Sequence, residues 1–270
     1  MIALPLLWII AWIAIFAVAP APSFIGVIVF AGIAIGFVVV VDVLAIVMTW
    51  RRSVMMPVSP PWWTRWYALV GILLLAAIAN NLAVGVAHRF YKPFYMPGES
   101  MAPALGTYDK IIADMRAGRH PAVGDVVLIR SGATTYVKRV IGLPGQRVSI
   151  SNDIPSIDGV KATVQSAGWT TFATAHGSIA GRLFHEMLPG TATSHDILIT
   201  EPTAYGNMDE TIIPPGMVFV LGDNRERSVD SRLPVDEQGL GMVPISNIVG
   251  QPLYVTWSHD HTKIGRPVSR

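Results

Sequence analysis

The chain has 270 residues, of which 51% are hydrophobic and only 14% are charged, and it contains no cysteine. This composition is too apolar for an ordinary soluble protein, and the lack of cysteine excludes disulfides, thiolate metal sites and a cysteine nucleophile. The net charge of +2 arises within residues 1–87, so the rest of the chain has no basic excess with which to bind nucleic acid.

Residues 1–87 are expected to form a membrane anchor of three transmembrane helices, at about 2–19, 24–49 and 67–87. Each range is nearly free of charge and about long enough to cross a bilayer. A cleavable signal peptide is the alternative for 2–19, but no basic residue precedes that apolar range. Arginines in the loop between the second and third ranges place this loop in the cytoplasm, and its tryptophans favour the membrane interface. Three spans predict a multi-pass protein with the lipid bilayer as a partner and with residues 88–270 on the extracytoplasmic face.

Two polar features within these ranges have open interpretations. Asp42 is either a functional carboxylate inside the membrane or one near the interface, hydrated or paired with an arginine. The amides of Asn80 and Asn81 need partners in a helix bundle or water, unless the third range is shorter than 67–87.

Residues 88–270 are predicted to form a mainly β domain with antiparallel sheets, because short runs of Val, Ile and Thr alternate with Gly and Pro turns. No segment of 12 or more residues shows a helical stripe. Residues 151–213 are richer in small and polar residues and are expected to form an inserted β-rich subdomain. The expected strands lie at 110–113, 123–130, 136–141, 145–150, 196–200, 217–221 and 248–257.

Ser100 is a candidate nucleophile in the stretch Gly98-Glu99-Ser100-Met101-Ala102-Pro103. A serine in such a turn is most often structural, so the surrounding pattern has to decide. A nucleophile elbow requires a helix after the serine, and none is predicted. A Ser-x-x-Lys pattern is excluded because Pro103 occupies the position of the lysine. A serine with a lysine base remote in sequence is the chemistry that remains.

Lys138 is the candidate base, within the apolar run Thr135–Ile141. A free lysine has a pKa near 10.4, so only about one molecule in several thousand is neutral at pH 7. Burial among Tyr, Val and Ile side chains would lower this pKa by roughly 2–3 units. The alternative is a lysine that faces solvent at a sheet edge.

A polar stretch, Gly222–Arg232, follows the apolar run Met217–Leu221 and predicts a salt-bridged loop. Ser228 or Ser231 would orient a neutral lysine there; the alternative is a surface turn with weak ion pairs. His259-Asp260-His261 has no accompanying ligand cluster, so we predict no metal and no other cofactor.

Together, and in this order, these stretches resemble the type I signal peptidase (leader peptidase) family of bacteria. Members of this family are membrane-bound serine endopeptidases that remove N-terminal signal peptides from exported preproteins. The matching motifs are Ser100-Met101-x-Pro103-x-Leu105, Tyr136–Arg139 followed by Gly142–Gly145, Gly222–Arg232, Gly241–Pro244 and Ile248–Gly250.

The resemblance implies a role for individual residues. Ser100 is the nucleophile and its N–H contributes to the oxyanion hole, neutral Lys138 is the general base, and Ser228 holds the lysine amine. The structural ion-pair loop comprises Asp223, Arg225, Asp230 and Arg232. The pockets for small side chains at the −1 and −3 positions of the signal peptide involve Pro97, Gly98, Met101, Leu105, Ile111, Tyr136 and Val137.

The resemblance also implies a monomer in the bacterial inner (plasma) membrane, with its catalytic domain at the periplasmic face. The chain departs from the family pattern at Gly98, where some members have an oxyanion-binding serine, and at Ala104, where threonine is usual. It also lacks the cysteine pair of some members and has more predicted spans than is common. Two alternatives are a peptidase specialised for a few secretion or conjugation clients, and a catalytically silent membrane β-domain that binds partners.

Overall fold

The computed structural model describes residues 88–117, 120–174, 177–200 and 205–268, together with the isolated positions 71, 74, 78, 81, 82 and 85. The chain divides into two compact units, residues 1–89 and residues 90–270. The isolated positions of the first unit are helical, and the predicted features at Asp42 and Asn80 lie outside the described residues.

The expectation of three transmembrane helices requires correction. Among the described positions, no helix is both long enough and apolar enough to span a bilayer. The ranges 2–19 and 24–49 lie outside the described residues, as does most of 67–87. The expectation was based on apolar content, and apolar content alone does not decide whether a segment forms one unbroken helix. The multi-pass topology derived from it therefore has no support.

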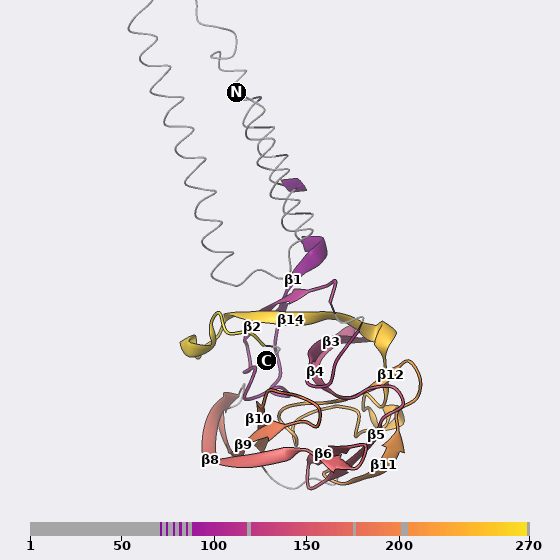
Figure 1. Ribbon diagram of the computed structural model, residues 1–270. Coiled ribbons are helices and arrows are strands. Elements are labelled where there is room, and N and C mark those ends of the chain that lie inside the picture. The colour runs from indigo at the N-terminus through magenta and orange to yellow at the C-terminus, as the bar shows by residue number, and fades with distance from the viewer. Residues whose placement is uncertain are drawn as a thin grey trace, which may run out of the picture. The chain divides into compact units, whose positions relative to one another are not determined.

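The second unit is built on a seven-stranded sheet in the order β1-β2-β14-β3-β4-β12-β13, in which every pair of neighbours is antiparallel. Figure 1 shows the long strand β14 running beside β2 within this sheet. Because β4 lies between β3 and β12, it is an interior strand and not an edge. The strands are β1 (Tyr91–Tyr95), β2 (Lys110–Asp114), β3 (Val126–Ser131), β4 (Thr134–Gly142), β12 (Met217–Leu221), β13 (Val243–Pro244) and β14 (Ile248–Trp257).

Residues 147–212 add two smaller antiparallel sheets, in the orders β10-β9-β8 and β11-β5-β6-β7. The prediction of a mainly β, antiparallel fold is confirmed, and each of the seven predicted ranges overlaps a strand. These sheets consist of β5 (Arg147–Ser151), β6 (Ile154–Ile157), β7 (Val160–Lys161), β8 (Thr163–Thr174), β9 (Gly177–Met187), β10 (His195–Ile199) and β11 (Met208–Ile212). Short 3-10 turns lie at η2 (Val235–Glu237), η3 (Ile245–Asn247) and η4 (His261–Lys263).

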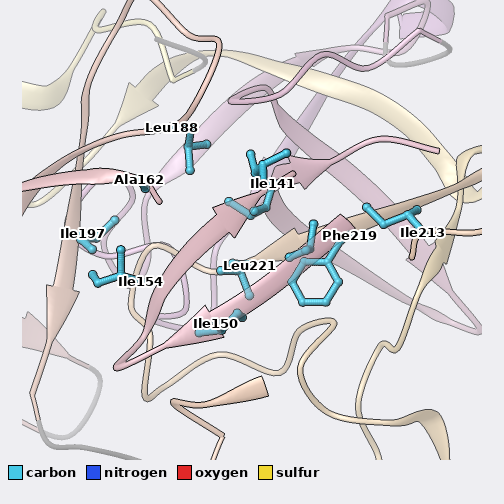
Figure 2. Close-up of a cluster of buried hydrophobic side chains, with 11 residues drawn as sticks. Ile141, Ile150, Ile154, Ala162, Leu188, Ile197, Ile213, Phe219 and Leu221 are labelled. Atoms are coloured by element: carbon cyan, nitrogen blue, oxygen red, sulfur yellow. The ribbon is translucent and has the colours of Figure 1, made fainter. Parts of the chain in front are cut away.

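A cluster of buried side chains joins the large sheet to the smaller ones. Figure 2 shows Ile141 of β4 and Phe219 and Leu221 of β12 among side chains from β5, β6 and β10, including Ile150 and Ile197. Burial of an aliphatic or aromatic side chain contributes roughly 1.5–3 kcal/mol. This cluster therefore fixes the position of 147–212 against the strand that carries Lys138.

A second buried cluster lies under the segment between β1 and β2. Met101 and Leu105 have no exposed surface, and they pack with side chains of β2, β3, β4 and β14. These two residues hold the segment containing Ser100 on the sheet.

Candidate active site

Ser100 lies in a compact turn, residues 99–105, which we call the Ser100 turn. The Ala102 amide donates to the Glu99 carbonyl at 3.0 Å, and the Leu105 amide donates to the Met101 carbonyl at 2.8 Å. Met101 and Leu105 point into the core, whereas Ser100 remains partly exposed. The turn therefore presents the Ser100 hydroxyl at the surface of the sheet on a backbone with little freedom.

Lys138 brings its amine to this hydroxyl from β4. Its Nζ lies 2.8 Å from Ser100 Oγ, although 38 positions separate the two residues. The Lys138 side chain is fully buried, and its Nζ lies 5.9 Å from the centroid of the Tyr136 ring. The alternative of a solvent-facing lysine at a sheet edge is therefore excluded, because β4 is an interior strand.

Burial lowers the pKa of Lys138 from 10.5 to about 8. The nearby carboxylates of Asp230 and Asp223 oppose this shift, and the Arg232 guanidinium assists it. Desolvation is the dominant cause because a charged ammonium loses most of its hydration in this position. With a pKa near 8, roughly one lysine in ten is neutral at pH 7, compared with one in several thousand for a free lysine.

The segment after β12 clamps the backbone of the Ser100 turn. The Asn224 amide donates to the Ser100 carbonyl at 3.1 Å, and its side-chain Nδ2 donates to the Glu99 carbonyl, also at 3.1 Å. Gly222 lies so close to the turn that a Cβ on it would overlap the Ser100 carbonyl oxygen and Ser228 Oγ. Asn224 and Gly222 were not assigned such roles from the sequence; their place in the Gly222–Arg232 motif was the available signal.

Ser228 lies beside the same clamp. Its side chain is buried, and its Oγ has no hydrogen-bond partner among the described residues. The hydrogen bonds of the described residues join Lys138 Nζ to Ser100 Oγ and include none to Ser228. Its role in orienting the lysine therefore stays a prediction. Ser231, the alternative, accepts a hydrogen bond from the Val220 amide at 3.0 Å, so its hydroxyl is already engaged.

Asp223 and Arg139 form a buried ion pair that joins the loop to β4. Arg139 donates to both carboxylate oxygens, at 2.8 and 2.7 Å, and also to the Gly124 carbonyl at 2.8 Å. Because Arg139 follows Lys138 directly, the pair fixes the loop against the strand that carries the amine. Sequence reasoning placed Asp223 in an ion-pair loop but missed its partner.

The other members of the predicted ion-pair loop, Arg225, Asp230 and Arg232, are also paired. Arg232 donates to both oxygens of Asp230, at 2.9 and 3.0 Å, and to Asp153 Oδ1 at 2.9 Å. Arg225 Nη2 lies 2.5 Å from Glu186 Oε2 of β9. Burial opposes ionisation of Glu186, but the combined effect of Arg225 and His195 outweighs it, and the pKa of Glu186 falls to about 2. Sequence analysis had no signal for Asp153 or Glu186 as partners, since both come from the 151–213 segment.

The residues predicted to contact substrate fall into two groups. Pro97 and Gly98 are exposed, Tyr136 is half-buried, and a Cβ on Gly98 would meet open space. The other four lie together in the buried cluster under the Ser100 turn: Met101, Leu105, Ile111 and Val137. The structure brings all four to the side of the turn opposite to solvent, and their contact with substrate stays a prediction.

Near the C-terminus, His259 packs against two aromatic rings. The His259 ring lies 4.8 Å from the Trp257 ring and 6.3 Å from the Tyr108 ring, in edge-on geometry with both. Across the part of the chain that the structure describes, no group of three or more His, Asp or Glu side chains is arranged to hold a metal ion.

A buried amine with a lowered pKa, in contact with a serine hydroxyl on an antiparallel β domain, is the arrangement of a serine hydrolase that uses lysine as its base. Comparison with known families narrows this class. The family model described as "Signal peptidase, peptidase S26" matches residues 63–257, and the chain belongs to this family.

Two curated relatives agree with this assignment. The chain is 32% identical to a signal peptidase I of Rickettsia massiliae over 149 residues, which cover 52% of this chain and 53% of the relative. It is 34% identical to the signal peptidase I of Rickettsia typhi, with the same coverage. The chain thus spans about half the length of the curated relatives it matches. A solved signal peptidase I from Enterococcus faecalis shares 25% identity, covering 49% of this chain and 96% of that chain with a TM-score of 0.28.

Proposed function

We propose that this protein is a serine endopeptidase that removes N-terminal signal peptides from exported preproteins. The observation that carries the proposal is the 2.8 Å contact between Ser100 Oγ and the buried Lys138 amine. Membership in the signal peptidase family supports the choice of substrate. A catalytically silent β-domain would gain nothing from a desolvated lysine, because its burial costs free energy.

In the proposed mechanism, Ser100 Oγ attacks the carbonyl carbon of the scissile peptide bond while neutral Lys138 accepts the hydroxyl proton. The resulting ammonium then donates this proton to the departing amine, and an acyl-enzyme remains on Ser100. Lys138 next deprotonates a water molecule that attacks the ester, and the proton returns to Ser100 Oγ. The Ser100 N–H stabilises the oxyanion, and Ser228 orients the lysine amine.

The substrate determines where the reaction takes place. The cleavage junction of an exported preprotein emerges on the outer side of the plasma membrane, so we include action at this extracytoplasmic face in the proposal. Small residues at −1 and −3 would bind near Gly98 and Tyr136, above the buried cluster that contains Met101 and Leu105. A three-helix anchor is not part of this proposal.

Cleavage of an Ala-x-Ala precursor peptide by the purified full-length protein tests the function. We expect a single cut after the second alanine, and no cut by Ser100→Ala or Lys138→Met. Ser231→Ala is a matched control for serine loss, since its hydroxyl binds the backbone of Val220 and does not contact the amine. Full activity of Ser100→Ala would exclude this serine as the nucleophile.

A further inference from the structure

The C-terminal segment, residues 258–268, lies beyond the region matched by the family model, which ends at residue 257. It nevertheless folds back along β14. The Gly265 amide donates to the Val255 carbonyl at 2.8 Å, and the Val268 amide donates to the Leu253 carbonyl at 3.0 Å. An isolated antiparallel bridge pairs Tyr254 with Pro267. The segment is therefore fixed to the sheet at several points.

Two of its residues reach the Ser100 turn. Val268 is buried in the cluster that contains Met101 and Leu105. Lys263 crosses to the turn itself, and its Nζ donates a 2.6 Å hydrogen bond to the Pro103 carbonyl. Lys263 belongs to a 3-10 turn whose start is capped by the Asp260 side chain, which accepts from the Thr262 amide at 3.0 Å. The position of the Lys263 backbone is thus defined before its side chain reaches Pro103.

Two side chains from outside the Ser100 turn bind its backbone, one before Ser100 and one after it. Asn224 binds the carbonyls of Glu99 and Ser100 at the start of the turn. Lys263 binds the carbonyl of Pro103, three residues after the nucleophile. A charged donor on a carbonyl makes a stronger hydrogen bond than a neutral one. The two side chains therefore restrain the backbone on both sides of the Ser100 hydroxyl.

We propose that Lys263 is a positioning residue that keeps the Ser100 turn in the geometry that places Oγ 2.8 Å from Lys138 Nζ. Lys263 acts through the Pro103 carbonyl and not on the reacting atoms. The effect on catalysis rests on the proposed peptidase function, whereas the effect on the turn does not. The C-terminal segment outside the family match is thereby a part of the site.

The test compares full-length Lys263→Met, Lys263→Arg and the matched control Arg266→Met. Arg266 lies in the same segment with an exposed side chain, so its loss removes the same charge without removing the bond to Pro103. We measure amide hydrogen exchange of residues 99–105, kcat and KM for an Ala-x-Ala peptide, and the urea midpoint of unfolding. Lys263→Gln repeats the test if the methionine variant does not fold.

We expect Lys263→Met to accelerate exchange of the Ala102 and Leu105 amides and to lower kcat, each by roughly ten- to a hundredfold. KM should change less than about threefold, and Lys263→Arg should recover most of both losses because it keeps a charged donor. A lower unfolding midpoint with unchanged exchange in the turn would overturn the proposal, as would equal effects of Lys263→Met and Arg266→Met. If the unsubstituted protein cleaves no precursor peptide, the proposed function fails, while the exchange rates still decide the role of Lys263.

Discussion

Replacing Lys138 with methionine would remove the buried amine while keeping a side chain of similar length and apolar character. Loss of the base should abolish peptide cleavage. The same change should make the folded protein more stable at pH 7, which is unusual for a substitution at a fully buried position. The two effects have one cause, because the site keeps the amine in an environment that disfavours its charged form.

The magnitude follows from the pKa of Lys138, which burial lowers from 10.5 to about 8. This difference corresponds to about 3 kcal/mol against the charged form in the folded protein at pH 7. Loss of the hydrogen bond between Lys138 Nζ and Ser100 Oγ costs about 1 kcal/mol in return. We therefore expect the variant to have a free energy of unfolding about 2 kcal/mol higher at pH 7.

The pH dependence provides a sharper test than a single value. Between pH 8 and 10.5 the unfolded chain binds more protons at Lys138 than the folded one, so the stability of the unsubstituted protein rises with pH over this window. The methionine variant lacks this contribution. Its advantage should shrink as the pH rises and become a deficit of about 1 kcal/mol above pH 10.5, where only the lost hydrogen bond remains.

Urea unfolding of both proteins at a series of pH values, with cleavage assayed in parallel, checks these expectations. Other titrating groups are the same in both proteins and cancel in the difference. A variant that is less stable at pH 7 by an amount that does not change with pH would refute the argument that the amine is desolvated. A variant that still cleaves precursor peptide would refute the role of Lys138 as the base.

Three further outcomes follow from the same geometry. The rate of cleavage, kcat/KM, should rise about tenfold per pH unit below a midpoint near 8, because neutral Lys138 is the active form; a pH-rate profile that is flat from 6 to 9 would contradict this. Gly222→Ala should lower activity and cost about 1–3 kcal/mol in urea unfolding, because its Cβ would overlap Ser228 Oγ; wild-type kinetics would contradict the close approach. Asp223→Ala should destabilise the fold by about 3–5 kcal/mol by leaving Arg139 buried and unpaired, and the double variant with Arg139→Met should recover part of this loss.

The strands of the large sheet were predictable because their buried positions hold apolar residues, which form a pattern visible in the sequence. Strand β12 and the first four residues of β3 are continuous apolar runs, as expected for strands covered on both faces. By contrast, β8 is a 12-residue strand, Thr163–Thr174, that contains several threonines and a glycine, and its side chains from 163 to 172 are mostly exposed. Backbone pairing with β9 forms this strand. Backbone hydrogen bonds do not require apolar side chains, so the strand shows little apolar pattern. For this reason sequence analysis identified 151–213 as β-rich but located only the strand at 196–200 within it.

The residues of the site also divide into those that sequence analysis could find and those that it could not. Ser100, Lys138 and Asp223 belong to short motifs, so sequence analysis could select them. The residues that bring these motifs together could not be found in the same way. Asn224 contacts Glu99 across 125 positions, and Lys263 contacts Pro103 across 160. A hydrogen bond to a backbone carbonyl requires no particular residue type at the acceptor, so the acceptor position carries no sequence signal.

The buried charges of the 222–232 loop explain why these distant contacts form together. A buried ion pair adds little net stability, since desolvation offsets most of the attraction, but the loss of one partner is costly. Asp223 is paired with Arg139 on the strand of the base, and Arg225 is paired with Glu186 on β9. Any shift of the loop by one residue would leave one of these charges buried without its partner. The loop can therefore adopt one register only, and in that register Asn224 meets the carbonyls of the Ser100 turn.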